Sequence, residues 1–157
     1  MSLWQLFDSR ERVALDTSVF IYLFNRQEPY YATCRRLVGD IERGELRGVI
    51  SAITEMEMLV RPLAEGLTRV VADIEQLLRR LRWLDIVPMD RALARQAAAL
   101  RAETRLRSLD AIIATTAIAA DCRYVVGNDR PFADRVKGVH YLVLRDYVAA
   151  PAEGTTA

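Results

Sequence analysis

Short apolar runs alternate with longer amphipathic stretches along most of this chain, and this alternation restricts the fold more than any other feature. Runs of Val, Ile and Leu bounded by turn residues are typical of buried strands. The predicted strands are 12–16, 46–52, 84–88, 124–128 and, more weakly, 139–144. The predicted helices are 19–24, 30–43, 55–64, 67–83, 90–105 and 109–120. Strands that alternate with helices predict an α/β fold with a mainly parallel sheet of four to five strands between two helical layers.

The length and composition are typical of one globular domain. The chain has 157 residues, of which 52% are hydrophobic and 27% charged, so it can bury a substantial core. Its longest uncharged apolar stretch, Ala111–Ala120, is too short to span a bilayer, and the N-terminus does not resemble a secretory signal. Cys34 and Cys122 lie far apart outside any CxxC motif, which favours reduced, buried thiols. We therefore expect a cytoplasmic protein without membrane association.

Charge alone does not indicate a nucleic-acid-binding protein, because the net charge is only +1. The charged residues are, however, unevenly distributed along the chain. Between Arg79 and Arg107 there are eight arginines but only three acidic residues. The guanidinium group suits phosphate contacts, yet solvated helix faces explain any single arginine equally simply. Both interpretations stay open, and the second is favoured for each arginine taken alone.

Four acidic residues stand at predicted strand ends or near the starts of predicted helices. They occur in VALDTSVFIYLF, SAITEMEMLV, SLDAIIATTAIAA and VVGNDRPF, and they are Asp16, Glu57, Asp110 and Asp129. The carboxyl ends of parallel strands lie along one edge of a sheet, and open α/β sheets bind ligands there. The four acids are therefore expected to gather in a common cleft.

Helix capping offers a structural explanation for each acid. The segment 16–18 can cap a helix, Thr54 with Glu57 forms a capping-box pattern, and Ser108 could cap the helix that Asp110 opens. Asp129 can start a turn or a short helix. Capping explains each acid singly but not why four would gather in one cleft, because clustered carboxylates repel one another and raise each other's pKa. A divalent cation relieves this repulsion, and an all-oxygen site suits Mg²⁺ or Mn²⁺.

Other chemistries fit the sequence poorly. The only histidine, His140, lies in an apolar run and is expected to be packed, so neither a zinc hydrolase nor a Ser-His-Asp triad can be assembled. Glycine-rich phosphate-binding motifs are absent from the sequence. A phosphoacceptor domain would need a lysine near the acids, and Lys137 stands late and alone. Metal-assisted hydrolysis of a phosphodiester is the remaining enzymatic interpretation.

Four segments together resemble the PIN-domain ribonucleases, and most closely the VapC-type toxins of bacterial toxin–antitoxin pairs. These segments are LDTSVFIYLF, ISAITEMEML, LDAIIATTA and VVGNDRPF, and the resemblance covers about residues 12–145. It implies a PIN-like three-layer α/β/α fold over 12–148, preceded by an extension at 1–11 and followed by a flexible tail at 149–157. The implied catalytic residues are Asp16, Glu57, Asp110 and Asp129, of which Asp16, Asp110 and Asp129 would bind the metal directly. The implied supporting residues are Ser18, Thr54 and Asn128.

The resemblance also implies endonucleolytic cleavage of RNA with Mg²⁺ or Mn²⁺, inhibition by a cognate antitoxin protein, and a homodimer. The apolar surfaces of 67–83 and 19–24 are the expected docking surfaces for the antitoxin. Two positions depart from the family pattern: Gly127 stands where a Thr or Ser is common, and Pro131 where an Asp is often found. These departures keep open a catalytically weak PIN-like module that binds RNA or assembles with a partner. A DNA-directed nuclease of related fold is a third alternative.

Overall fold

A single parallel sheet organises the molecule. The computed structural model describes residues 1–148, in which the strands are β1 (Arg12–Leu15), β2 (Arg47–Ser51), β3 (Leu84–Val87), β4 (Tyr124–Gly127) and β5 (His140–Val143). Their order in the sheet is β3-β2-β1-β4-β5, and all of the pairs are parallel. The predicted α/β class is confirmed, and the fifth strand, the weakest prediction, is present.

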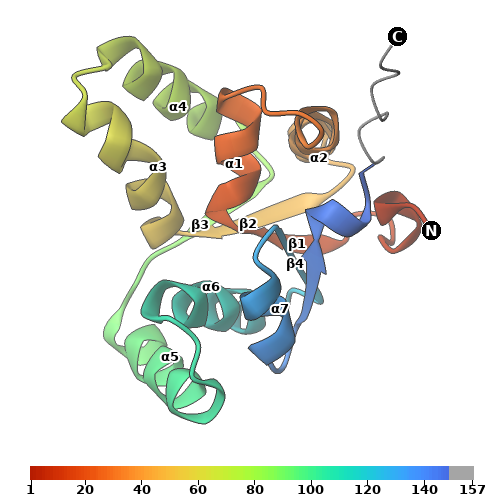
Figure 1. Ribbon diagram of the computed structural model, residues 1–157, viewed down its shortest axis with the longest axis vertical. Helices are drawn as coiled ribbons and strands as arrows, with labels where there is room; N and C mark the ends of the chain where they lie inside the picture. The colour runs from red at the N-terminus through yellow and green to blue at the C-terminus, as the bar shows by residue number, and fades with distance from the viewer. Residues whose placement is uncertain (149–157) are drawn as a thin grey trace, which may run out of the picture.

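Helices cover both faces of this sheet. They are α1 (Thr17–Phe24), α2 (Tyr31–Arg43), α3 (Ala52–Ala64), α4 (Thr68–Arg80), α5 (Arg91–Thr104), α6 (Ser108–Ala119) and α7 (Arg130–Arg135). Figure 1 shows α1 to α4 on one side of the sheet and α5 to α7 on the other. The expected three-layer arrangement is therefore confirmed. Each described helix stops short of what a bilayer crossing requires in length and apolar character.

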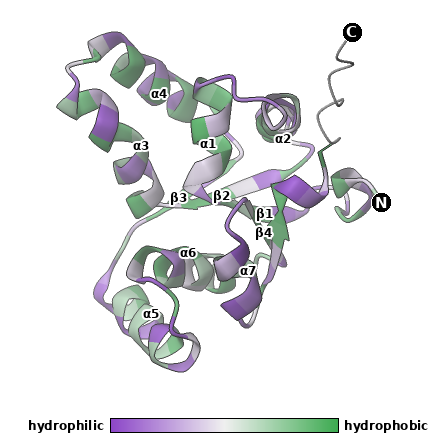
Figure 2. Ribbon diagram, viewed as in Figure 1, coloured by the Kyte–Doolittle hydropathy of each residue, from purple (hydrophilic) through white to green (hydrophobic). Residues whose placement is uncertain are grey.

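The central strand is buried on both of its faces. Val13 and Leu15 of β1 pack with Phe20 and Ile41 in one hydrophobic cluster, whereas Ala14 packs with residues of α6 in a second cluster. Successive strand residues point to opposite faces, so one short strand serves both clusters. Figure 2 shows hydrophilic and hydrophobic residues alternating along α3 and α4, as expected for helices with one face in water.

The sheet order places a topological switch beside β1. After β1 the chain builds β2 and β3 on one side, and then crosses over to build β4 and β5 on the other. Val13 of β1 is thus in register with Gly48 of β2 and with Tyr124 of β4. Ligands in open α/β sheets bind at the carboxyl ends of the two strands that flank such a switch. In this chain that point lies between Leu15 and Gly127.

Several predicted details differ from the structure. α1 begins at Thr17, one residue after β1, and α3 begins at Ala52, directly after β2. His140, expected to be packed, is exposed at the start of β5. Both cysteines are buried and unpaired, as expected.

The residues at the two ends complete the description of the chain. The segment before β1 packs onto the domain: Leu3 is buried, and the indole Nε1 of Trp4 donates to Asp40 Oδ2 at 2.7 Å. The predicted tail, 149–157, lies outside the described residues.

Candidate active site

A pocket of about 440 Å³ opens at the carboxyl edge of the sheet, beside the topological switch. It is lined by all four predicted acids, Asp16, Glu57, Asp110 and Asp129, together with the predicted supporting residues Ser18 and Asn128. Thr54, the third predicted supporting residue, is not among the lining residues. The structure therefore brings the acids together as the strand-end argument predicted. The Thr54 side chain is instead fully buried within α3.

Asp16 is held by hydrogen bonds at both of its carboxylate oxygens. It follows β1 directly, and its backbone N–H donates to the carbonyl of Val126 in β4 at 2.9 Å. Its Oδ1 accepts from the backbone N–H of Thr17 at 2.7 Å, which makes Asp16 itself the N-cap of α1. Its Oδ2 accepts from the Tyr141 hydroxyl at 2.7 Å. Both carboxylate oxygens are therefore held in place.

The environment of Asp16 disfavours its negative charge. Burial raises the pKa of Asp16 to about 6. The nearby carboxylates of Asp110 and Glu57 add to this rise, while the hydrogen bonds from Tyr141 and Thr17 partly offset it. Such a group is stabilised in its ionised form by a bound cation. The pKa of Tyr141 is also raised, by its burial and by the Asp16 carboxylate, so its hydroxyl keeps its proton and acts as a donor.

Arg107 joins Asp110 to Asp129. Its Nε donates to Asp110 Oδ2 at 2.8 Å, and its Nη2 contacts Asp110 Oδ1 at 3.2 Å and Asp129 Oδ2 at 2.5 Å. The other Asp129 oxygen caps α7 by accepting from the backbone N–H of Phe132 at 2.9 Å. The predicted cap by Ser108 is wrong, because Ser108 is already the first residue of α6 and Arg107 occupies the N-cap position without a side-chain bond. The protein thus places its own cation between two of the acids.

Glu57 is held from α1. The Thr17 hydroxyl donates to Glu57 Oε2 at 2.6 Å. The predicted capping box of Thr54 and Glu57 is wrong, because α3 begins earlier and Ser51 caps it by accepting from the N–H of Ile53 at 3.2 Å. Freed from a capping role, Glu57 extends into the pocket from the second turn of the helix.

The two supporting residues in the pocket, Asn128 and Ser18, differ in whether their side chains have hydrogen-bond partners. The Asn128 side chain donates to the Tyr22 hydroxyl at 2.9 Å and accepts from the N–H of Arg145 at 3.1 Å. It therefore ties the loop after β4 to the rest of the domain. The Ser18 hydroxyl is buried and has no hydrogen-bond partner within residues 1–148. A buried polar group of this kind calls for a water molecule or a ligand in the pocket.

Sequence reasoning missed Thr17, Arg107 and Tyr141. Arg107 could have been found from its spacing, since residues three apart on a helix lie on one face and Asp110 is three residues ahead. Gly127 at the end of β4 was a sign of close approach by another group, but it did not identify Tyr141. Lys137 pairs with Glu103 at 2.8 Å and does not line the pocket, which removes the lysine that a phosphoacceptor domain needs.

The donor chemistry of the pocket fits a hard divalent cation. Asp16, Asp110, Asp129 and Ser18, which carry carboxylate or hydroxyl oxygens, line it, and oxygen ligands are those that Mg²⁺ and Mn²⁺ prefer. Among the described residues, no three His, Cys, Asp or Glu side chains are already arranged to hold an ion. The contacts of Arg107 explain this finding, because its guanidinium lies between two of the carboxylates. An ion could bind Asp110 and Asp129 only after Arg107 moves aside.

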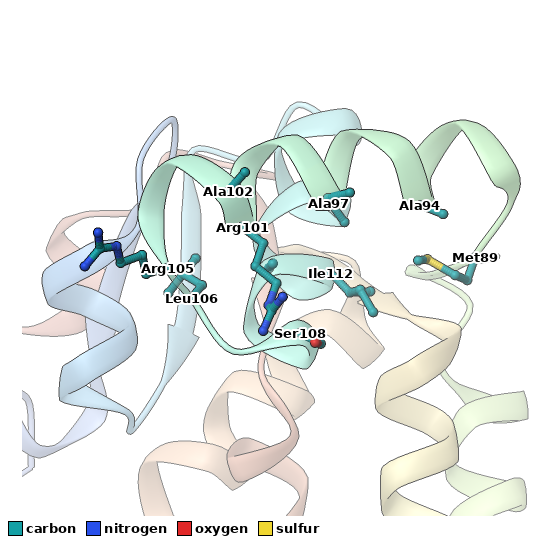
Figure 3. Close-up of a pocket in the computed structure, with 11 residues that line it drawn as sticks. Met89, Ala94, Ala97, Arg101, Ala102, Arg105, Leu106, Ser108 and Ile112 are labelled. Atoms are coloured by element: carbon teal, nitrogen blue, oxygen red, sulfur yellow. The ribbon is translucent and has the colours of Figure 1, made fainter.

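A second hollow adjoins the acidic pocket. It measures about 570 Å³, lies between α5 and α6, and shares Ser108 with the acidic pocket. Alanines form much of its wall, and Arg101 and Arg105 stand on its α5 side. Figure 3 shows the Arg101 side chain extending toward Ser108, at the start of α6. Two arginines thus border the approach to the acids from this side.

Comparison with known proteins agrees with the architecture. The PIN domain family model matches residues 13–138, whereas no curated protein matches the chain. The fold is similar to that of a DNA-bound VapBC complex from Salmonella typhimurium, with 24% identity, a TM-score of 0.66, and coverage of 85% of this chain and 98% of that one. FitAcB from Neisseria gonorrhoeae gives 22% identity, a TM-score of 0.68 and the same two coverages.

A third structure of similar fold is VapC20 from Mycobacterium tuberculosis, described as a sarcin–ricin loop cleaving toxin. It has 16% identity and a TM-score of 0.63, with coverage of 82% of this chain and 98% of that one. At these identities the structures establish the fold, and the family model establishes membership. The family expected from the four sequence segments is therefore confirmed: the chain belongs to the PIN domain family.

Proposed function

We propose that this chain is a metal-dependent endoribonuclease and the toxin of a toxin–antitoxin pair. The observation that carries the proposal is the convergence of Asp16, Glu57, Asp110 and Asp129 in one pocket at the topological switch. Membership of the PIN domain family supports nuclease chemistry. The toxin role is supported by the proteins of similar fold, which include toxin–antitoxin complexes and an RNA-cleaving toxin.

Asp16, Asp110 and Asp129 would hold Mg²⁺ or Mn²⁺, and Glu57 would act through a water molecule. When bound, such a cation supplies the Lewis acidity that promotes attack of water on phosphorus and neutralises charge on the leaving oxygen. The chain prepares the site in two ways. The Thr17 backbone and the Tyr141 hydroxyl orient Asp16, and the Thr17 hydroxyl orients Glu57. The unpartnered Ser18 hydroxyl can position a water molecule among these acids.

Arginines would guide the RNA backbone into this pocket. Arg107 is the nearest, and its side chain is 71% exposed, so it can turn from Asp110 and Asp129 toward a phosphate once a cation occupies the site. Arg101 and Arg105 border the adjoining hollow. Guanidinium groups suit contacts to phosphate, which position a nucleic acid without reading its sequence.

An apolar surface close to the acids would serve the protein partners. It consists of Ile21 on α1, Met56, Val60 and Leu63 on α3, and Leu67, which are 43–62% exposed. A groove of about 350 Å³ lies beside it between α1, α3 and α4. We propose this surface, which includes part of both predicted docking segments, for the antitoxin or for a second copy of the chain. The buried, unpaired cysteines agree with a cytoplasmic site of action.

The test is cleavage of total cellular RNA by the purified protein. Samples would contain Mg²⁺, Mn²⁺ or a chelator, and Asp110→Asn would be prepared in parallel with wild type. Cleavage that requires the cation and disappears in the variant is the expected result. Equal cleavage by both proteins would point to a contaminating nuclease and overturn the proposal. If neither protein cleaves and both bind RNA, the binding-module alternative replaces it, and cleavage of DNA alone would identify a DNA-directed enzyme.

A further inference from the structure

Gly127 marks a place where three groups crowd together. A Cβ atom added to Gly127 would lie 2.1 Å from the Tyr141 hydroxyl oxygen, and 2.7 Å from both Cβ and Oδ2 of Asp16. All three distances are well below van der Waals contact. The residue ends β4 and has no positive φ angle, so backbone conformation does not demand glycine here. Glycine is required for lack of space, because the Tyr141 hydroxyl fills the volume that a side chain at position 127 would occupy.

The hydroxyl in that space connects two of the acids. It donates to Asp16 Oδ2 at 2.7 Å and accepts from the backbone N–H of Asp129 at 3.2 Å. Asp16 follows β1 and Asp129 follows β4, so one oxygen atom spans the two strand ends at the topological switch. The contact reaches from a third strand, β5, in which Tyr141 is the second residue.

The Tyr141 side chain is firmly placed. Its ring packs on Phe132 with the ring centroids 4.4 Å apart, and the residue is only 9% exposed. Phe132 belongs to α7, the helix that Asp129 caps. The hydroxyl therefore sits at a fixed position relative to both acids, and it cannot turn away to solvent without disturbing the core.

We propose that Tyr141 is a positioning residue of the acidic site, and that Gly127 is required because it leaves room for the Tyr141 hydroxyl. This inference deepens the proposed function and rests on it for the identity of the metal ligands. Hydrogen bonds to metal-binding carboxylates fix their orientation, and removal of such a partner commonly costs about 10-fold to 100-fold in metal affinity or activity. Gly127 stands where the family commonly has Thr or Ser. In this chain the Tyr141 hydroxyl, from β5, takes the place of the missing hydroxyl group.

The experiment measures Mn²⁺ binding to the full chain by isothermal titration calorimetry, together with thermal unfolding in a chelator. Tyr141→Phe keeps the ring and removes the hydroxyl. Tyr124→Phe is the matched control, because Tyr124 is similarly buried in the neighbouring strand but, unlike Tyr141, does not hydrogen-bond to Asp16 or Asp129. We expect about 10-fold weaker Mn²⁺ binding in Tyr141→Phe, a Tm near that of wild type, and unchanged binding in Tyr124→Phe. Wild-type affinity in Tyr141→Phe would overturn the inference.

Gly127→Ala tests the same point without altering the tyrosine. Its methyl group would press on the Tyr141 hydroxyl and on Asp16 itself, so Mn²⁺ affinity should fall by about 10-fold or more. In the Tyr141→Phe background only the clash with Asp16 is left. The added loss from Gly127→Ala should then be smaller, giving a non-additive double-mutant cycle. Fully additive effects on Mn²⁺ affinity would overturn the inference. The Mn²⁺ affinities can be compared even if one of the single variants has a lowered Tm.

RNA cleavage separates this inference from the proposed function. If the hydroxyl acts by orienting metal-binding carboxylates, raising the Mn²⁺ concentration should restore most of the cleavage that Tyr141→Phe loses. If the wild type binds Mn²⁺ more tightly than Tyr141→Phe but cuts no RNA, the ribonuclease proposal is refuted and the positioning role of Tyr141 stands. If the wild type cuts RNA but Tyr141→Phe binds Mn²⁺ with wild-type affinity, the ribonuclease proposal stands and the positioning role of Tyr141 is refuted.

Discussion

Arg107 gives a direct test of how the acidic pocket changes when a cation binds. In the structure its guanidinium bridges Asp110 and Asp129, so a divalent cation would compete with it. The proposed nuclease would then use the released side chain to contact phosphate. Arg107→Ala should therefore strengthen Mn²⁺ binding and weaken RNA binding. Opposite changes in two affinities are difficult to produce by general damage to the fold.

The size of the first effect follows from exposure. The Arg107 side chain is 71% exposed, whereas that of Asp110 is only 11% exposed. Ion pairs with such a solvated partner contribute at most about 1 kcal/mol, even with the two-point geometry seen here. Removing the competitor should then improve Mn²⁺ affinity by no more than about fivefold, since about 1.4 kcal/mol corresponds to a factor of ten.

The assay is calorimetric titration with Mn²⁺ and fluorescence anisotropy with a labelled RNA at several salt concentrations. Loss of one phosphate contact should lower the slope of log affinity against log salt by about one. Arg95→Ala, an exposed arginine of the same helical region outside the pocket, is the control for net charge. Weaker Mn²⁺ binding in Arg107→Ala, or an RNA salt slope equal to that of wild type, would refute this account of the pocket.

Three further predictions concern neighbouring groups. In a chelator, the Asp16 contribution to the free energy of unfolding should fall by about 2.5 kcal/mol as pH rises from about 4 to about 7. Folding raises the pKa of Asp16 from its ordinary value of 3.8 to about 6, so the folded state binds the extra proton. Urea titrations should show this fall in the difference between wild type and Asp16→Asn. Thr17→Val removes the donor to Glu57 and should lower RNA cleavage about 10-fold with little change in Mn²⁺ affinity, and a change confined to Mn²⁺ affinity would contradict it. Arg101→Ala should weaken RNA binding to a similar degree for unrelated sequences without affecting Mn²⁺, and a sequence-selective loss in anisotropy would count against a phosphate contact.

Strand ends made the acids predictable from sequence. Asp16 and Asp129 directly follow β1 and β4, and Asp110 and Glu57 lie in the first and second turns of α6 and α3. Parallel strands end at one edge of the sheet whatever the details of packing. The same local signals were less reliable for helix starts. Thr54 had the pattern of a cap, but the chain turns directly from β2 into α3, so Ser51 takes that role and Thr54 is buried.

Contacts between distant segments were beyond prediction from sequence. Tyr141 reaches Asp16 across 125 positions of the chain, through a strand whose pattern was the weakest of the five. No local pattern encodes which side chain of a neighbouring strand will fill the space above a glycine. Gly127 could be recognised as unusual, but its partner emerges only from the register of β4 and β5.

The sheet order also determines when the site can form during synthesis. β1 lies in the centre, and its neighbour β4 is made long after β2. Domains fold from the N-terminus as they leave the ribosome, yet Asp129 and Tyr141 belong to the last part of the domain to emerge. A growing chain that ends before β4 holds Asp16, Glu57 and Asp110 beside an unpaired strand edge, with neither the fourth acid nor the tyrosine in place. The proposed nuclease would therefore have no complete site while most of it is still being translated.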